Sequence, residues 1–150
     1  MKIEYDGQQE EAYSLTIYKT HAKAIASGEK TVEIRSYSNK NCEMFLDAQK
    51  LERNARLEAE GKGDKREWPM KDIFAIHFYD RGGRYSLDVL LDYCYCGLAC
   101  MCKEDIQMLG EKFGFHDYDD EWQQYAKLPA EERPWFFWFH VCEVVNSRGL

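Results

Sequence analysis

The 150-residue sequence contains no long hydrophobic run, no apolar leader and no excess of positive charge. A membrane-spanning helix needs roughly 20 consecutive apolar residues, and no segment approaches that length, so no membrane association is expected. Residues 1–14 lack the apolar region of a secretory signal peptide. We therefore expect a cytoplasmic protein, in which the six cysteines are reduced thiols.

The formal charge of −7 argues against a general DNA-coating protein, because neutralising phosphates requires clustered lysine and arginine. The charge is unevenly distributed along the chain. Residues 19–40 include five basic and two acidic residues, so this segment carries +3 and the remainder carries −10. One basic region on an acidic protein suits recognition of a single anionic ligand or a short strand.

The length fits one domain, and the pattern of apolar residues predicts strands alternating with helices in the order β-α-β-α-β-β-α-α-β. The few crossover helices favour an α+β fold: a small mixed β-barrel of about five strands with peripheral helices. The predicted strands are 14–20, 31–38, 73–80, 85–96 and 135–145, with a hairpin turn at 81–84, and the predicted helices are 21–27, 42–60, 102–113 and 119–128.

Several residues mark where these helices begin and end. Thr20 is a candidate N-cap for the first helix, and Gly28 and Gly114 are candidate helix stops. The 42–60 helix carries a single apolar stripe with helical spacing. It is interpreted as a surface helix, with a lid or partner-binding helix as the alternative. The stripe consists of Met44, Ala48, Leu51 and Ala55.

The most informative motif is G-x-K-x-x-E-x-R, formed by Gly28, Lys30, Glu33 and Arg35. Residues i and i+2 of a strand share a face, so Glu33 and Arg35 are expected side by side, with Lys30 entering from the preceding loop. Val32 and Ile34 would then fill the inward face, leaving the charged pair in a groove or in solvent.

Each charged residue of the motif is suited to ligand chemistry. Lys30 can hold a phosphate or carbonyl oxygen, or act as a base or nucleophile. Glu33 can accept hydrogen bonds from a cytosine or guanine edge, or transfer protons. Arg35 can clamp a phosphate or stack on a base. The structural alternative for all three is an ion pair. The candidate ligand-binding residues are Lys30, Thr31, Glu33, Arg35, Tyr37 and His21, and the candidate catalytic residues are Lys30 and Glu33.

The motif and its context resemble the ASCH domain (activating signal cointegrator homology) of the PUA-like β-barrel superfamily. Residues 14–38 carry the resemblance specifically, and the element order extends it over most of the chain. It implies one ASCH/PUA-like domain over residues 1–150, with a helical expansion at about 41–70. It also implies a cleft beside the first helix, lined by the motif.

The resemblance implies that RNA or a modified nucleoside is the partner. Some family members are amidohydrolases that deacylate a modified cytidine nucleoside, using a lysine that corresponds to Lys30, a threonine and a further glutamate. This chain has Glu33 in place of the threonine, which favours binding over deacylation. The region that would supply the further carboxylate contains Asp117, Asp119 and Asp120.

Four cysteines cluster at Cys94, Cys96, Cys100 and Cys102. Thiolates can bind zinc, but structural zinc sites use C-x2-C pairs, so these residues are interpreted as interior or strand thiols. No metal and no cofactor is expected. His77 and His140 each interrupt an apolar strand, and the aromatic run 135–139 predicts a central strand buried on both sides.

Three functions remain open at this point. The first is binding of RNA or a modified nucleoside or nucleotide. The second is an enzyme, either an amidohydrolase acting on an N-acylated cytidine-type nucleoside or a ribonuclease. The third is a protein-interaction module that uses the 42–60 helix.

Overall fold

The computed structural model describes residues 1–150, except for the side chains of residues 93–95. The chain divides into two compact units. The first consists of Met1–Arg35 and Ile73–Leu150, and the second consists of Ser36–Asp72. The expansion predicted at about 41–70 lies inside the second unit, while the assignment of the whole chain to one domain stays a prediction.

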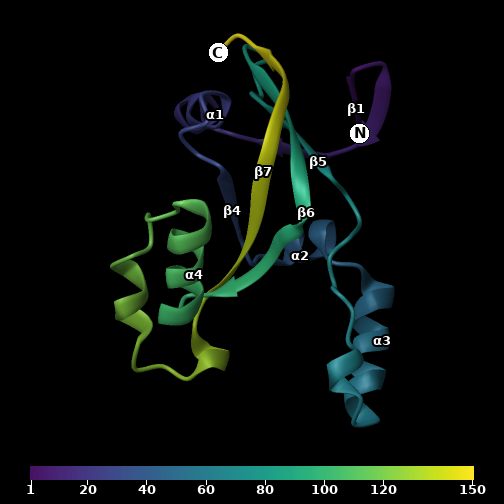
Figure 1. The fold of residues 1–150 in the computed structure, drawn as a ribbon, viewed down its shortest axis with the longest axis vertical. Coiled ribbons are helices and arrows are strands. Elements are labelled where there is room, and N and C mark those ends of the chain that lie inside the picture. Colours follow the sequence, from purple (N-terminus) through teal and green to yellow (C-terminus); the bar gives the residue numbers. More distant parts are fainter. The chain divides into compact units, whose positions relative to one another are not determined.

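A mixed five-stranded sheet organises the first unit, with the strand order β3-β5-β6-β7-β4 (Figure 1). β3 runs parallel to β5, whereas β5 and β6, and β6 and β7, are antiparallel. The predicted α+β class, strand number and β5–β6 hairpin are confirmed. The strands are β3 (Tyr13–Thr16), β4 (Val32–Ser36), β5 (Ala75–Tyr79), β6 (Ser86–Cys100) and β7 (Trp135–Arg148).

The sheet curls so that its two edge strands approach each other. β3 and β4 lie at opposite edges in the strand order, yet Arg35 Nη2 on β4 donates a hydrogen bond of 2.8 Å to the Thr16 carbonyl on β3. This hydrogen bond joins the two edge strands, so the sheet is curled as the predicted small β-barrel requires. In the centre, Phe136, Phe137, Trp138 and Phe139 of β7 are all buried, as predicted for a strand covered on both sides. The prediction is wrong for Trp135, which begins the run and is 40% exposed.

α1 (Lys19–Ala26) lies between β3 and β4 in the chain and buries Ala22 and Ile25. Gly28 follows the helix with φ +81°, and its N–H donates to the Ile25 carbonyl, as expected for a helix stop. The predicted N-cap at Thr20 is wrong. The helix begins two residues earlier than predicted, at Lys19, because Tyr18 is extended and its carbonyl already accepts from the Ala22 N–H.

α4 (Lys103–Phe113) ends at Gly114, which is left-handed with φ 67°, as predicted. The helix predicted over 119–128 is wrong in type and length, because only η2 (Glu121–Tyr125) forms, and it is a 3-10 helix. The Arg133 guanidinium donates to the carbonyls of Ala126 and Leu128, so these groups are satisfied without further helical turns. A further 3-10 turn, η3 (Ala130–Glu132), precedes β7.

The second unit contains two helices where the sequence predicted one over 42–60. They are α2 (Asn39–Phe45) and α3 (Ala48–Ala59). The break has a local cause, because the Asp47 carboxylate caps α3 by accepting from the N–H groups of Gln49 and Lys50. Leu46 is extended and forms a β-bridge with Met70. The short 3-10 helix η1 (Gly63–Lys65) follows α3.

An N-terminal hairpin, which was not predicted, joins β1 (Lys2–Tyr5) to β2 (Gln8–Glu11). Its turn residues Asp6 and Gly7 have φ values of 47° and 74°. Asp-Gly is a strong signal for a two-residue hairpin turn, so the sequence did contain the information. Ile3 of this hairpin packs in a cluster with Ala12 and Ala75. In the described residues no helix is long and apolar enough to cross a membrane.

Candidate functional site

The three charged residues of the motif meet around one carboxylate oxygen. Glu33 Oε1 lies 3.7 Å from Lys30 Nζ and 3.7 Å from Arg35 Nε. The chain positions Lys30 through the helix stop, because the Lys30 backbone N–H donates to the Ala24 carbonyl of α1 at 3.0 Å. Two cations therefore surround one carboxylate, which leaves a formal surplus of one positive charge.

The two faces of β4 contact different surroundings. Val32 and Ile34 belong to the apolar cluster that includes Ile106 and Leu109 of α4, as the strand pattern predicted. Residues alternate between the faces of a strand, so Glu33 and Arg35 lie on the opposite one, where Arg35 Cζ is 5.9 Å from the centre of the Phe78 ring. Solvent exposure of the carboxylate, one of the two predicted alternatives, is wrong because Glu33 is only 5% exposed.

Two buried polar atoms of this cluster have no hydrogen-bond partner among the described residues. They are Glu33 Oε2 and Arg35 Nε. The other carboxylate oxygen, Oε1, accepts from the Ile34 N–H at 3.1 Å. A buried polar group without a partner is destabilising by about 1–3 kcal/mol, and more if charged. The cluster thus offers one unsatisfied acceptor and one unsatisfied donor on neighbouring side chains.

The remaining predicted ligand-binding residues have other surroundings. Thr31 Oγ1 donates to the Phe113 carbonyl at 3.2 Å, which ties the start of β4 to the end of α4. His21 is exposed on α1, with its ring 6.5 Å from that of Tyr18. Tyr37 belongs to the second unit, where burial first and then Cys42 raise the pKa of its hydroxyl. Their roles in ligand binding stay predictions.

In the region proposed to supply a further carboxylate, the partly buried side chain is that of a tyrosine, Tyr118. Asp117, Asp119 and Asp120 are all exposed. Tyr118 is half-buried and packs edge-on against Phe136 with ring centres 5.5 Å apart. Its hydroxyl pKa is raised by burial above all, then by Glu121, Asp117 and Glu33. Tyr118 therefore lies within electrostatic reach of Glu33, and no local pattern distinguished it in the sequence.

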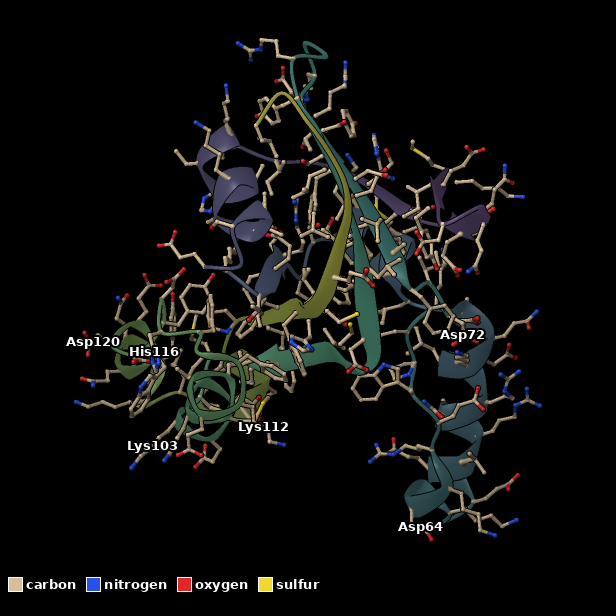
Figure 2. The ribbon with its side chains drawn as sticks, turned by 45° about the horizontal axis from the view of Figure 1, so that its top comes forward. Asp64, Asp72, Lys103, Lys112, His116 and Asp120 are labelled. Atoms are coloured by element: carbon tan, nitrogen blue, oxygen red, sulfur yellow. The ribbon has the colours of Figure 1, made fainter. Side chains whose placement is uncertain are left out.

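A surface cavity of about 450 Å³ lies elsewhere in the first unit, on α4 and η2. Its wall includes His116, whose Nδ1 is 2.8 Å from Asp119 Oδ2. Gly110 makes room for this ring, because a Cβ there would meet His116 Cε1 at 3.1 Å. Figure 2 labels His116, Lys103 and Asp120 on this part of the molecule. The lining residues are Lys103, Ile106, Gln107, Gly110, Glu111, His116, Asp119 and Trp122.

The cysteine cluster is only partly within the described side chains, because Cys94 lies outside them. Cys96 and Cys100 are buried and Cys102 is half-buried. Burial raises the pKa of the Cys102 thiol to about 11 and also raises that of Cys100. Across the described residues, no group of three or more His, Cys, Asp or Glu side chains is arranged to hold a metal ion.

No protein-family model matches the chain, and no curated protein matches it. Among solved structures, the chain is similar to the crystal structure of a serine-to-alanine mutant of the ZmASCH protein from Zymomonas mobilis. The likeness covers 89% of this chain and 72% of that chain, with 15% sequence identity and a TM-score of 0.43. The name of that protein includes ASCH, the family that residues 14–38 resemble. The likeness transfers no residue role to this chain.

Proposed function

We propose that the Lys30–Glu33–Arg35 cluster binds RNA or a modified nucleoside or nucleotide. The observation that supports this most directly is the pair of unsatisfied atoms, Glu33 Oε2 and Arg35 Nε. Both atoms are buried, so a ligand that presents a donor next to an acceptor would satisfy them once the neighbouring side chains move to admit it. The Watson–Crick edge of cytosine has this pattern, because its N4 amino group donates while N3 and O2 accept.

The charges of the cluster support an anionic group on the same ligand. Glu33 balances one of the two cations, so the second is available for a phosphate. Lys30 is the suitable one, because the Arg35 guanidinium already donates to the Thr16 carbonyl, while the two side chains are similarly exposed, at 19% and 22%. A base edge on Glu33 and Arg35 together with a phosphate near Lys30 describes a nucleotide better than a free base.

Titration calorimetry with cytidine monophosphate, N4-acetylcytidine and a short single-stranded RNA tests the proposal. The Lys30→Ala variant should fold normally and lose at least about tenfold in affinity for the monophosphate, as expected when a charge-assisted hydrogen bond is removed. An unchanged dissociation constant would reject the proposed site.

Lys23→Ala is the matched control, because Lys23 is an exposed lysine of α1 in the same basic segment. It removes the same unit of charge without touching the cluster. If both variants weaken binding equally, the contribution is long-range electrostatics rather than contact. Thermal unfolding of each variant shows whether a loss of affinity reflects a loss of fold.

The second candidate function is hydrolysis of an N-acylated cytidine-type nucleoside, or of RNA, at the same cluster. It is favoured by the distance of 3.7 Å between Lys30 Nζ and Glu33 Oε1, which places an ammonium beside a carboxylate whose other oxygen is buried and has no hydrogen-bond partner among the described residues. Incubation with N4-acetylcytidine and with RNA, followed by chromatography, distinguishes the two functions. Release of neither cytidine nor RNA fragments over a range of pH would leave binding alone.

A further inference from the structure

A second group of polar residues, outside the motif, crosses the sheet of the first unit. Strand pairing places Ser14 on β3 opposite His77 on β5, and His77 opposite Asp88 on β6. Paired residues on neighbouring strands project from the same face of a sheet. Ser14, His77 and Asp88 therefore stand in one row, in the order in which a nucleophile, a base and an orienting carboxylate act in hydrolases.

At one end of this row, hydrogen bonds hold the Asp88 carboxylate in place. His77 Nδ1 lies 2.5 Å from Asp88 Oδ1, and the side chains are 18% and 14% exposed. Asp88 Oδ2 accepts from Asn146 Nδ2 at 2.8 Å, and the same amide donates to the Glu4 carbonyl of β1. A carboxylate only accepts hydrogen bonds, so the proton of a neutral imidazole lies on Nδ1 and Nε2 is left as the base.

The imidazole is held on a second side by an aromatic neighbour. The His77 ring stacks on Tyr79, two residues along the same strand, with centres 5.9 Å apart and planes 13° apart. Since Nδ1 faces Asp88 on β6, Nε2 lies on the side of the ring away from that carboxylate.

Ser14 itself is accessible. It is exposed on an edge strand, while its neighbours Tyr13 and Leu15 are buried on the other face. Neighbouring strands lie about 4.8 Å apart, so Ser14 and His77 are direct neighbours on one face of the sheet, although no hydrogen bond joins their side chains among the described contacts. Such contacts are often loose until a substrate binds.

From this geometry we propose that Ser14, His77 and Asp88 form an acyl-transfer site that acts on small carboxylic esters, separate from the Lys30 cluster. Ser14 Oγ attacks the ester carbonyl carbon while His77 Nε2 takes its proton, and the resulting imidazolium returns that proton to the departing alkoxide. Water, deprotonated by the same nitrogen, then releases the acid and restores Ser14. Asp88 holds the ring in place and stabilises the imidazolium.

A fluorophosphonate probe tests the nucleophile in the whole 150-residue chain, because Ser14 Oγ would displace its fluoride to form a stable adduct. Peptide mass spectrometry should locate the adduct on Ser14, and Ser14→Ala should abolish it. His77→Gln should slow labelling about 100-fold, the typical size of general-base assistance. Hydrolysis of p-nitrophenyl acetate should fall in parallel in both variants.

Ser86→Ala is the matched control, since Ser86 lies on the same strand as Asp88 but pairs with Tyr79 rather than with His77. It should label at the rate of the parent protein. No adduct, an adduct at another residue, or equal labelling of Ser14 in the His77→Gln variant would overturn the proposal. Circular dichroism melts confirm that the variants fold, and Asp88→Asn gives a second, independent test of the base.

Discussion

Two carboxylates of the same unit, those of Glu33 and Asp88, have opposite hydrogen-bonding states. Glu33 is the more buried residue, but its Oε2 has no hydrogen-bond partner among the described residues. Asp88 is paired at both oxygens, with His77 at Oδ1 and Asn146 at Oδ2. The first arrangement leaves one oxygen without a partner among the described residues, whereas the second pairs both oxygens and fixes the orientation of a neighbouring ring.

The difference shows that burial alone does not measure what a polar group contributes to folding. A satisfied carboxylate stabilises the fold and is costly to remove, while an unsatisfied one can be removed with little loss of stability. Stability and ligand binding should therefore respond in opposite ways at the two residues. Substitutions at three positions test this contrast.

The largest effect on stability is expected from Arg35→Ala. The variant loses the hydrogen bond from Nη2 to the Thr16 carbonyl that joins β4 to β3, and it also loses the packing of the guanidinium on the Phe78 ring. A hydrogen bond made by a charged group typically contributes about 1.5–3 kcal/mol. Urea unfolding should show this loss. Arg81→Ala, in the exposed β5–β6 turn, serves as the control and should change little.

Asp88→Asn should have an intermediate effect of about 2 kcal/mol, because it replaces a charged acceptor that pairs with two side chains. The side-chain amide introduced by this substitution also carries N–H donors, and these would face the N–H donor of either His77 or Asn146 without an acceptor between them. Urea unfolding measures the loss, with Glu143→Gln on the exposed part of β7 as control. If Asp88→Asn lowers the free energy of unfolding much less than Glu33→Gln does, the proposed difference between the two carboxylates is wrong.

Glu33→Gln should have the smallest effect on stability, less than about 1 kcal/mol, although Glu33 is the more buried of the two acids. The amide oxygen can still accept from the Ile34 N–H, and no satisfied bond of Oε2 is lost. The two ion pairs that the substitution removes are long, at 3.7 Å each, and involve partly exposed cations, so they contribute little. Calorimetry should nevertheless show weaker binding of cytidine monophosphate. If stability falls by several kcal/mol with binding unchanged, Glu33 is a structural residue only.

The sequence predicted the elements whose signals are local. Gly28 and Gly114 stop helices because both adopt positive φ, and the aromatic run at 136–139 forms a buried central strand. The helix predictions were wrong where hydrogen bonds from one side chain outweighed the helical spacing of the apolar residues. Asp47 splits the predicted 42–60 helix by capping α3, and Arg133 satisfies the carbonyls that the predicted 119–128 helix would have used.

The amino-acid sequence alone determined the α+β class and the neighbourhood of Lys30, Glu33 and Arg35, because these depend on residues that lie within a few positions of one another. Only the tertiary structure decided that Glu33 is buried with an oxygen unpaired and that Ser14, His77 and Asp88 share one row. Strand pairing joins residues more than sixty positions apart, and no local propensity encodes that register.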